Sequence, residues 1–253
     1  MKRWAYPMLL LAILVGAWQV AASTGLLARL LNLESFLVPS PAEVAGALWD
    51  NRALIAENAW VTLREVLLGF GCGLLAGVGF ALVCHLSETM RRATYPLLVA
   101  SQAIPIVAIA PILVVLFGFG IWPKLVIVAL ICFFPITVNT LDGLRSVDPD
   151  ALRLMRTLDG SRWQTLRRVE APSALPYTFS GAKIAVAVAV IGAVFAEWSA
   201  ATVGHGGLGW LIKEDNALLQ TSRLFAEVLV LGLMAVGLFG LLALVERRVV
   251  TWR

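Results

Sequence analysis

Charge is what this sequence lacks most. Only 14% of its 253 residues are charged, whereas 60% are apolar and the mean hydropathy is +0.86. A soluble domain carries about 25% charged residues, so most of this chain cannot face water. The composition excludes an ordinary soluble protein and predicts one that crosses a membrane several times.

Patterns for catalysis and metal binding are also missing. The three cysteines have no C-x-x-C spacing, which argues against a disulfide framework and a zinc site. The two histidines, His85 and His205, have no second ligand nearby, and no serine lies in a G-x-S-x-G context. The loop that cradles nucleotide phosphates, G-x-x-x-x-G-K-[ST], is absent from the sequence. We therefore expect this chain to bind no cofactor or metal and to be no enzyme, so that any energy from ATP must come from a partner.

Apolar runs long enough to cross about 30 Å of hydrocarbon are abundant. They predict an all-α membrane protein of about six transmembrane helices, forming a single domain over residues 1–253. The runs lie near 4–22, 61–84, 94–117, 122–141, 177–200 and 224–245.

Positive charge is unevenly distributed around these runs. If the N-terminus is cytoplasmic, 13 of the 20 Lys and Arg residues fall in cytoplasmic segments. This asymmetry follows the positive-inside rule and predicts that both termini and the loop at about 142–176 are cytoplasmic. The net charge of +4 then reflects topology, and we expect no nucleic acid partner.

The first apolar run also has an alternative interpretation. Lys2 and Arg3, the apolar run and the small residues 21–23 resemble a secretory signal peptide. The run is long enough to span and ends without a clear A-x-A cleavage site, which favours a retained helix. Beyond it, the Pro39-Ser40-Pro41 turn predicts a short amphipathic helix to about Trp49, on the outer surface.

The polar stretch between the fourth and fifth runs predicts two short capped helices. Asp148 can cap the first helix, and Ser161 with Gln164 forms a capping-box pattern for the second. Between them, Asp159 and Gly160 break the chain, and we expect a positive φ at Gly160. A linker that only joined two spans would not need two capped helices, so the stretch is interpreted as a site where another protein binds.

Apolar and basic side chains of this loop offer the contacts. The apolar ones would enter a cleft of the partner and the basic ones would meet its acidic rim. In the alternative interpretation, the apolar residues pack beneath their own spans and the arginines serve only topology. The residues concerned are Leu154, Leu158, Trp163, Leu166, Arg156, Arg162 and Arg167.

Several motifs together resemble the permeases of binding-protein-dependent ABC transporters. They are the Pro-Ser-Pro turn, Arg-Ser-Val-Asp-Pro at the start of the loop, Gly-Ser-Arg-Trp-Gln within it, Ala-Leu-Pro after it and Gly-Gly-Leu-Gly-Trp before the last span. The resemblance is greatest to the branch that imports nitrate, taurine, alkanesulfonates and thiamine pyrimidine precursors. The family signature is Glu-Ala-Ala, three residues, Gly, nine residues and Ile-x-Leu-Pro. Aligned on Pro172, it places Arg153-Leu154-Met155 at the triplet and Asp159 at the Gly, so spacing and proline match while the triplet and glycine do not.

The resemblance implies a type I ABC importer fold in the cell inner membrane. A small polar or anionic solute would move inward, delivered by an extracytoplasmic solute-binding protein and driven by a cytoplasmic ATPase dimer that uses ATP. A second permease subunit, identical or different, would complete the path within the lipid bilayer. An ion-coupled secondary transporter is the alternative; only Glu65 and Glu197 are candidates for its carboxylates.

Polar and helix-breaking residues in the spans are candidates for the translocation path. Gln102, Pro105 and Pro111 would line it, because each proline frees a backbone carbonyl that needs a partner; the alternative is a merely bent span. A charge in hydrocarbon costs roughly 3 kcal/mol, so Glu197 should face the interior, as a gate or as a structural ion pair. Asn139 belongs either to a helix–helix hydrogen bond or to the cytoplasmic mouth of the path.

A glycine-rich stretch before the last span suggests an outer gate. Gly204, Gly206, Gly207 and Gly209 permit close approach and positive φ. With Leu208 and Trp210 as its apolar contacts, the stretch would form a compact plug in which Gly207 tolerates no bulk; the alternative is a flexible loop.

Overall fold

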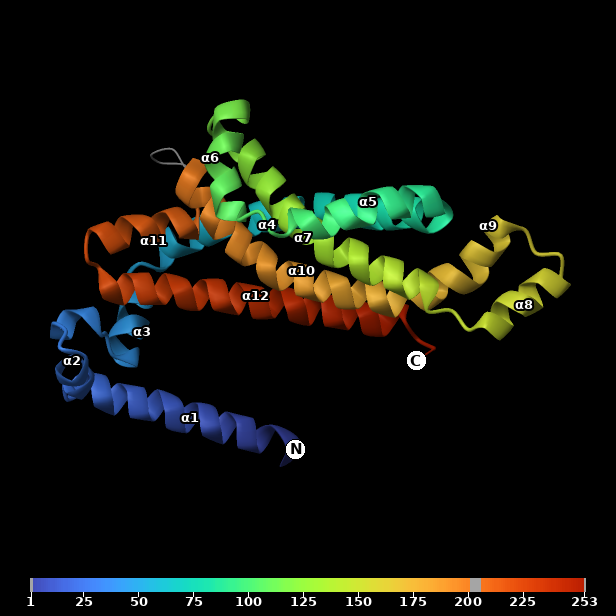
Figure 1. The fold of residues 1–253 in the computed structure, drawn as a ribbon. Helices are drawn as coiled ribbons and strands as arrows, with labels where there is room; N and C mark the ends of the chain where they lie inside the picture. The colour runs from blue at the N-terminus through green and yellow to red at the C-terminus, as the bar shows by residue number, and fades with distance from the viewer. Residues whose placement is uncertain (1, 201–205, 253) are drawn as a thin grey trace. The chain divides into compact units, whose positions relative to one another are not determined.

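The computed structural model describes residues 2–200 and 206–252, and its regular elements over these residues are all helical (Figure 1). The contacts divide the chain into two compact units. The first unit comprises residues 1–61 and 206–232, and the second comprises 62–205 and 233–253. Two long helices run through both units, and the assignment of the whole chain to one domain stays a prediction.

The first unit contains α1 (Lys2–Ser23), α2 (Leu26–Leu31), the 3-10 turn η1 (Ser35–Leu37), α3 (Pro41–Asp50) and α11 (Leu208–Ala217). The second contains α5 (Glu88–Ser101), α6 (Ile106–Phe117), α7 (Ile121–Arg145), α8 (Pro149–Thr157), α9 (Arg162–Thr165), the π turn η2 (Leu166–Glu170) and α10 (Ala171–Ala200). The helices shared by both are α4 (Arg52–Leu86) and α12 (Thr221–Val249).

Five of the six predicted spans are confirmed as single helices. Within the described part of the chain, α1, α4, α7, the run from α9 to α10, and α12 are long and apolar enough to cross a membrane. The prediction of one continuous helix over 94–117 is wrong, because this region is divided into α5 and α6. Pro105 has no N–H to donate and disfavours helical geometry at Ile104, so the helix stops and a new one begins at Ile106.

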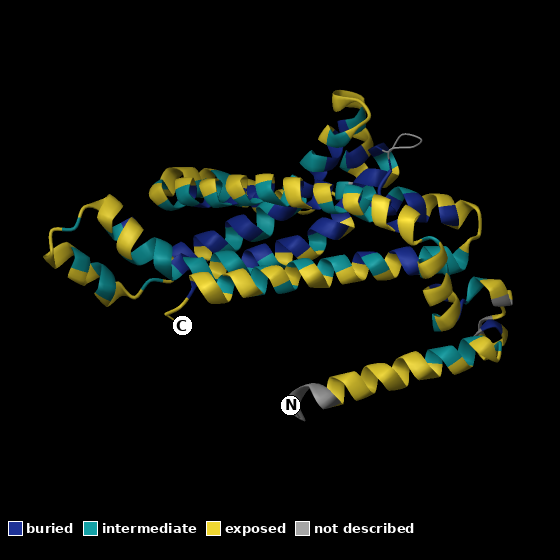
Figure 2. Ribbon diagram, turned by 180° about the vertical axis from the view of Figure 1, so that it is seen from behind, coloured by how far each residue is buried: buried dark blue, intermediate teal, exposed yellow. Residues whose placement is uncertain are grey.

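Small residues let the helices of the second unit approach closely. Gly69, Gly73 and Gly77 recur every fourth residue on α4 and face α7. A Cβ on Gly73 would lie 2.7 Å from the Cβ of Cys132 and 2.8 Å from the carbonyl oxygen of Ala129. Such small residues are typical of helix interfaces in membranes. The buried residues accordingly follow α7 and α10 (Figure 2).

In the first unit, α3 begins at the predicted turn. The Ser40 hydroxyl accepts a hydrogen bond from the Glu43 backbone N–H, and the Glu43 carboxylate accepts one from the Ser40 N–H at 2.7 Å. Pro41 occupies the first helical position, where its missing N–H costs nothing. The short helix predicted to end near Trp49 is therefore confirmed.

Candidate coupling segment and translocation helices

The first helix of the loop is capped at both ends. The Asp148 carboxylate accepts a hydrogen bond from the Asp150 N–H at 2.8 Å. At the other end, the Asp159 N–H donates to the Arg156 carbonyl (3.1 Å) and the Gly160 N–H donates to the Met155 carbonyl (2.9 Å). These two bonds form a Schellman motif, which requires a left-handed residue after the helix.

That left-handed residue is Asp159, with φ of 51°, and Gly160 has no positive φ. Our expectation for Gly160 was wrong, because Asp is one of the few non-glycine residues that tolerate this conformation. Asp159 stands at the glycine position of the family signature, so the backbone shape is kept although the residue has changed. Gly160 is constrained instead by space: a Cβ there would lie 2.9 Å from the Met155 carbonyl oxygen.

The second helix also begins as predicted. The Ser161 hydroxyl accepts from the Gln164 N–H, and the Gln164 side chain accepts from the Ser161 N–H at 2.8 Å. It is not a separate short helix, however. It continues through the π turn η2 into α10, so that residues 162–200 form one helical run. The wider π turn ends two residues before Pro172, which has no N–H for a regular helical bond.

We use the name coupling segment for residues 148–170. Three of its large apolar side chains face outward: Leu154, Leu158 and Trp163 are 59%, 68% and 66% exposed. Leu166, the fourth apolar residue that was predicted to contact a partner, is only 4% exposed and packs beside Leu144 and Ala174. Its predicted place at a partner surface is therefore wrong. The predicted basic residues Arg156, Arg162 and Arg167 are all exposed.

The coupling segment is tied to the end of α4 at two points. Arg162 donates a hydrogen bond to the Leu86 carbonyl at 2.7 Å. Nε2 of His85 lies 2.9 Å from a carboxylate oxygen of Glu170. Sequence reasoning missed both contacts, since residues about 80 positions apart carry no local signal of their pairing.

The predicted path residues of the third span lie around its break. Gln102 and Pro105 are the first and last of the four residues between α5 and α6, and Pro111 lies inside α6; all three are exposed. The amide N–H groups of Gln102, Ala103 and Ile104 bond to carbonyls three residues earlier, as a tightening last turn does.

Glu197 is fully buried and joins α10 to α4. Its carboxylate accepts a hydrogen bond from the Thr62 hydroxyl at 2.7 Å. One turn along α4, the Glu65 carboxylate lies 2.7 Å from Nζ of Lys124 on α7, and both are almost completely buried. These four residues form a polar cluster that connects α4, α7 and α10. Sequence reasoning selected Glu65 and Glu197 but not Lys124.

Asn139 lies at a close crossing of α7 and α10. Its side-chain amide donates to the Pro135 carbonyl of its own helix at 2.8 Å. A Cβ on Gly181 of α10 would lie 2.8 Å from the Asn139 Cβ, so the two helices touch at this point. Farther along α10, Lys183 Nζ pairs with Glu246 of α12 at 2.8 Å.

The predicted outer gate is described only in part, because residues 201–205, with Gly204 and His205, lie outside the described residues. Gly206 and Gly207 are buried, and α11 begins at the fully buried Leu208. Gly207, the N-cap of α11, has a φ of −105°, so a positive φ is not what this position requires. Close approach is confirmed at Gly206, where a Cβ would lie 2.4 Å from the Trp210 ring.

A second charged cluster, in the first unit, was missed. Arg223 donates through two nitrogens to the carboxylate of buried Asp215, and its Nε lies 3.8 Å from buried Glu227. The sequence did indicate part of this cluster, because Arg223 and Glu227 stand four residues apart at the start of an apolar run, a spacing that brings two side chains together on one face of a helix.

Comparison with known proteins agrees with this architecture. A family model described as "Binding-protein-dependent transport system inner membrane component" matches residues 69–251. The riboflavin transport system permease protein of Chloroflexus aurantiacus is 36% identical over 248 residues, covering 97% of this chain and 89% of the relative. The formylaminopyrimidine transport permease protein of Halalkalibacterium halodurans is 34% identical over 248 residues, covering 98% and 95%.

A solved structure supports the fold. The inward-facing MetNI methionine ABC transporter has a chain that matches with a TM-score of 0.65 and 19% identity, over 80% of this chain and 97% of that one. This likeness shows a type I importer permease fold and nothing about substrate. The chain therefore belongs to the family of binding-protein-dependent transport system inner membrane components, the permease subunits of ABC importers.

Proposed function

We propose that this permease subunit moves a small polar or anionic solute inward, while a cytoplasmic ATPase dimer binds its coupling segment and hydrolyses the ATP. The observation that carries this proposal is the exposure of Leu154, Leu158 and Trp163 on a capped, hydrogen-bonded segment. Large apolar side chains held outward on ordered helices are typical of helix-in-groove recognition. The exposed Arg156 and Arg167 would meet acidic residues at the rim of the groove.

The proposed orientation places both termini and the coupling segment in the cytoplasm. It is supported by the excess of Lys and Arg in the segments assigned to that side. A second permease subunit, most simply another copy of this chain, would complete the path. The long apolar helix α12 supports a second subunit, because only 6% of its most apolar 18-residue stretch is buried within this subunit. The rest of that stretch must contact lipid or protein.

For the path itself, we propose that the break between α5 and α6 faces the solute. Non-helical backbone at membrane depth is tolerated only where it is buried in protein or lines a water-filled cavity. The break is exposed in the subunit, so Gln102 and Pro105 would line that cavity, with Pro111 less than two helical turns beyond Pro105. Asn139 would lie at its cytoplasmic mouth, and Glu197 and Gly207 would serve the outer gate.

Two relatives support a proposal for the class of solute. Permeases that are named for riboflavin and for formylaminopyrimidine both exceed 30% identity over nearly the whole chain. Both solutes contain nitrogen heterocycles, so we propose a heterocyclic vitamin or vitamin precursor. The binding protein, rather than this chain, would select it.

The coupling role is tested by Trp163→Glu in proteoliposomes that contain the permease, its ATPase and its binding protein. Placing a charge in an apolar cleft should cost at least about 2 kcal/mol of ATPase binding, or about 30-fold in affinity. We expect the ATPase to dissociate and uptake to fall, with membrane insertion unchanged. Trp252→Glu is the matched control, since Trp252 is also exposed but lies outside the coupling segment.

Two outcomes would count against the proposal. Full ATPase retention and uptake in Trp163→Glu would remove the docking role. Wild-type uptake that stops with a protonophore but continues without ATP would instead indicate an ion-coupled carrier.

A further inference from the structure

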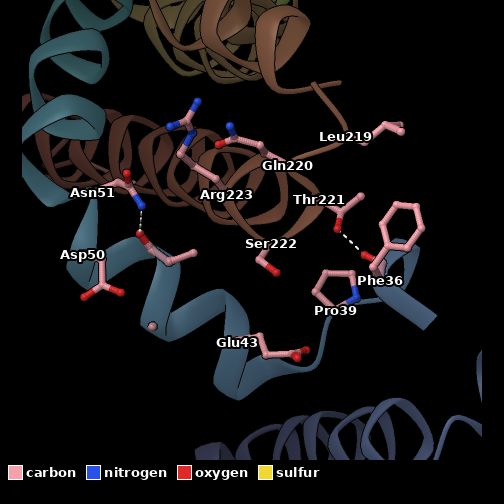
Figure 3. A pocket seen from close by; sticks show the side chains of 12 residues that line it. Phe36, Pro39, Glu43, Asp50, Asn51, Leu219, Gln220, Thr221, Ser222 and Arg223 are labelled. Atoms are coloured by element: carbon pink, nitrogen blue, oxygen red, sulfur yellow. Dashed lines mark hydrogen bonds between the residues drawn. The ribbon is translucent and has the colours of Figure 1, made fainter. Parts of the chain in front are cut away.

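The first unit contains a cavity of about 580 Å³ that the proposed path does not use (Figure 3). One wall is α3, which contributes Glu43 and Asp50, and the other is the turn that joins α11 to α12. Gly46 lies between the two acidic residues on α3, and no atom lies within 4 Å of where its Cβ would be. The cavity is therefore open between two carboxylates.

Both walls are held by bonds within the protein, so the cavity is formed in advance of any ligand. The Ser40 capping box fixes the start of α3, and the Asn51 side chain donates to the Ala47 carbonyl at its end, at 2.9 Å. Across the cavity, the Thr221 hydroxyl donates to the Phe36 carbonyl. A site that is ordered before binding loses less entropy when its partner arrives.

The lining carries negative charge. Hydrogen bonds from the Ser40 backbone N–H and hydroxyl lower the pKa of Glu43 below its usual range, so it stays ionised at neutral pH. The Asp50 carboxylate makes no hydrogen bond or ion pair with any residue that the structure describes. Arg223, which also lines the cavity, is already matched by the buried Asp215. Glu43 and Asp50 therefore favour a cationic occupant.

The spacing of the carboxylates excludes a single metal ion as that occupant. Glu43 and Asp50 are seven residues apart on one helix, about 10 Å at 1.5 Å per residue, whereas a cation binds oxygens at about 2–2.6 Å. Exposed apolar side chains, Phe36 and Leu219, also line the cavity. A charged pocket with apolar neighbours is typical of a protein interface anchored by one long basic side chain.

We propose that this cavity is the socket for a lysine or arginine of the extracytoplasmic solute-binding protein. The inference rests on the proposed function, because the orientation given above places α3 and the α11–α12 turn outside. The basic side chain would lie along α3 between Glu43 and Asp50, and the apolar rim would exclude water around it.

The test measures binding of the solute-binding protein to the permease–ATPase complex in nanodiscs. In the double variant Glu43→Gln/Asp50→Asn, affinity should fall at least about tenfold, and its dependence on salt should weaken. Gln can replace Glu43 in the capping box, so α3 should still form. Glu57→Gln, which removes an exposed carboxylate on α4 outside the cavity, is the control and should bind as the wild type does.

A zero-length carbodiimide should also join Glu43 or Asp50 of the wild-type complex to a lysine of the binding protein, if the side chain is lysine. Equal affinity and equal salt dependence in the double variant and the wild type would overturn the socket. Failure of the proposed function looks different: the wild-type complex itself would then show no binding and no stimulated ATP hydrolysis. Basal ATP hydrolysis should be unchanged in both variants.

Discussion

In the helical core of α4, α7 and α10, charged side chains are buried and glycines face the neighbouring helix, whereas in the coupling segment large apolar side chains face outward. Lys124 and Glu65 are almost completely buried, while Trp163 and Leu158 are about two-thirds exposed. Each arrangement costs free energy in an isolated subunit. The difference teaches that the core pairs its buried lysine with a carboxylate of its own, whereas the coupling segment is left for a partner to cover.

The largest effect is expected in the core, from Lys124→Met. Removing the lysine leaves the buried Glu65 carboxylate without its ion pair, which typically destabilises a protein by about 3–5 kcal/mol. Thermal unfolding in nanodiscs should shift downward accordingly. The double variant Lys124→Met/Glu65→Leu should recover most of the loss, because no buried charge is then unpaired; if the double variant is as unstable as the single one, the cluster is not held by this pair.

A smaller effect of a different kind is expected in the coupling segment, from Gly160→Val. The new side chain would press on the Met155 carbonyl and disturb the turn between α8 and α9, at about 1–3 kcal/mol. ATPase binding and uptake should fall while the unfolding temperature of the core stays the same. Gly79→Val is the control, since a Cβ there meets no atom within 4 Å. A lowered unfolding temperature would show that core and segment are not energetically separate.

The smallest effect should have the opposite sign. Asp159→Gly removes the cost of a left-handed conformation at a residue with a Cβ and should stabilise the turn by up to ~1 kcal/mol. Slower amide hydrogen exchange in α8 would confirm it. Faster exchange would mean that the Asp159 side chain contributes more to the turn than its backbone costs.

Features fixed by a few neighbouring residues could be predicted from the sequence. The caps at Asp148 and Ser161 were found because each depends on a donor within three residues. The spans were found because hydrophobic length is a local property. At the third span the sequence predicted that Pro105 would disturb the helix, but not whether the helix would bend or end there. A missing N–H is equally compatible with a bend and with a full break.

Features that depend on distant residues could not be predicted. The pairing of Lys124 with Glu65, and of His85 with Glu170, is set by which helices pack together. That Asp159 rather than Gly160 adopts the left-handed conformation could not be predicted for another reason. Glycine is the usual left-handed residue, and only the hydrogen bonds of the turn identify which residue adopts this conformation.

The uninterrupted run from α9 through α10 has a mechanical consequence. Its 39 residues extend about 58 Å as a helix, with Trp163 at one end and Glu197 at the other. A rod of this kind transmits a push along its length almost without loss, so the two ends cannot shift independently along its axis. Its compliant joints are the π turn at 166–170 and the prolines that follow it, Pro172 and Pro176, which makes tilting, rather than compression, the motion that a force applied at Trp163 would produce.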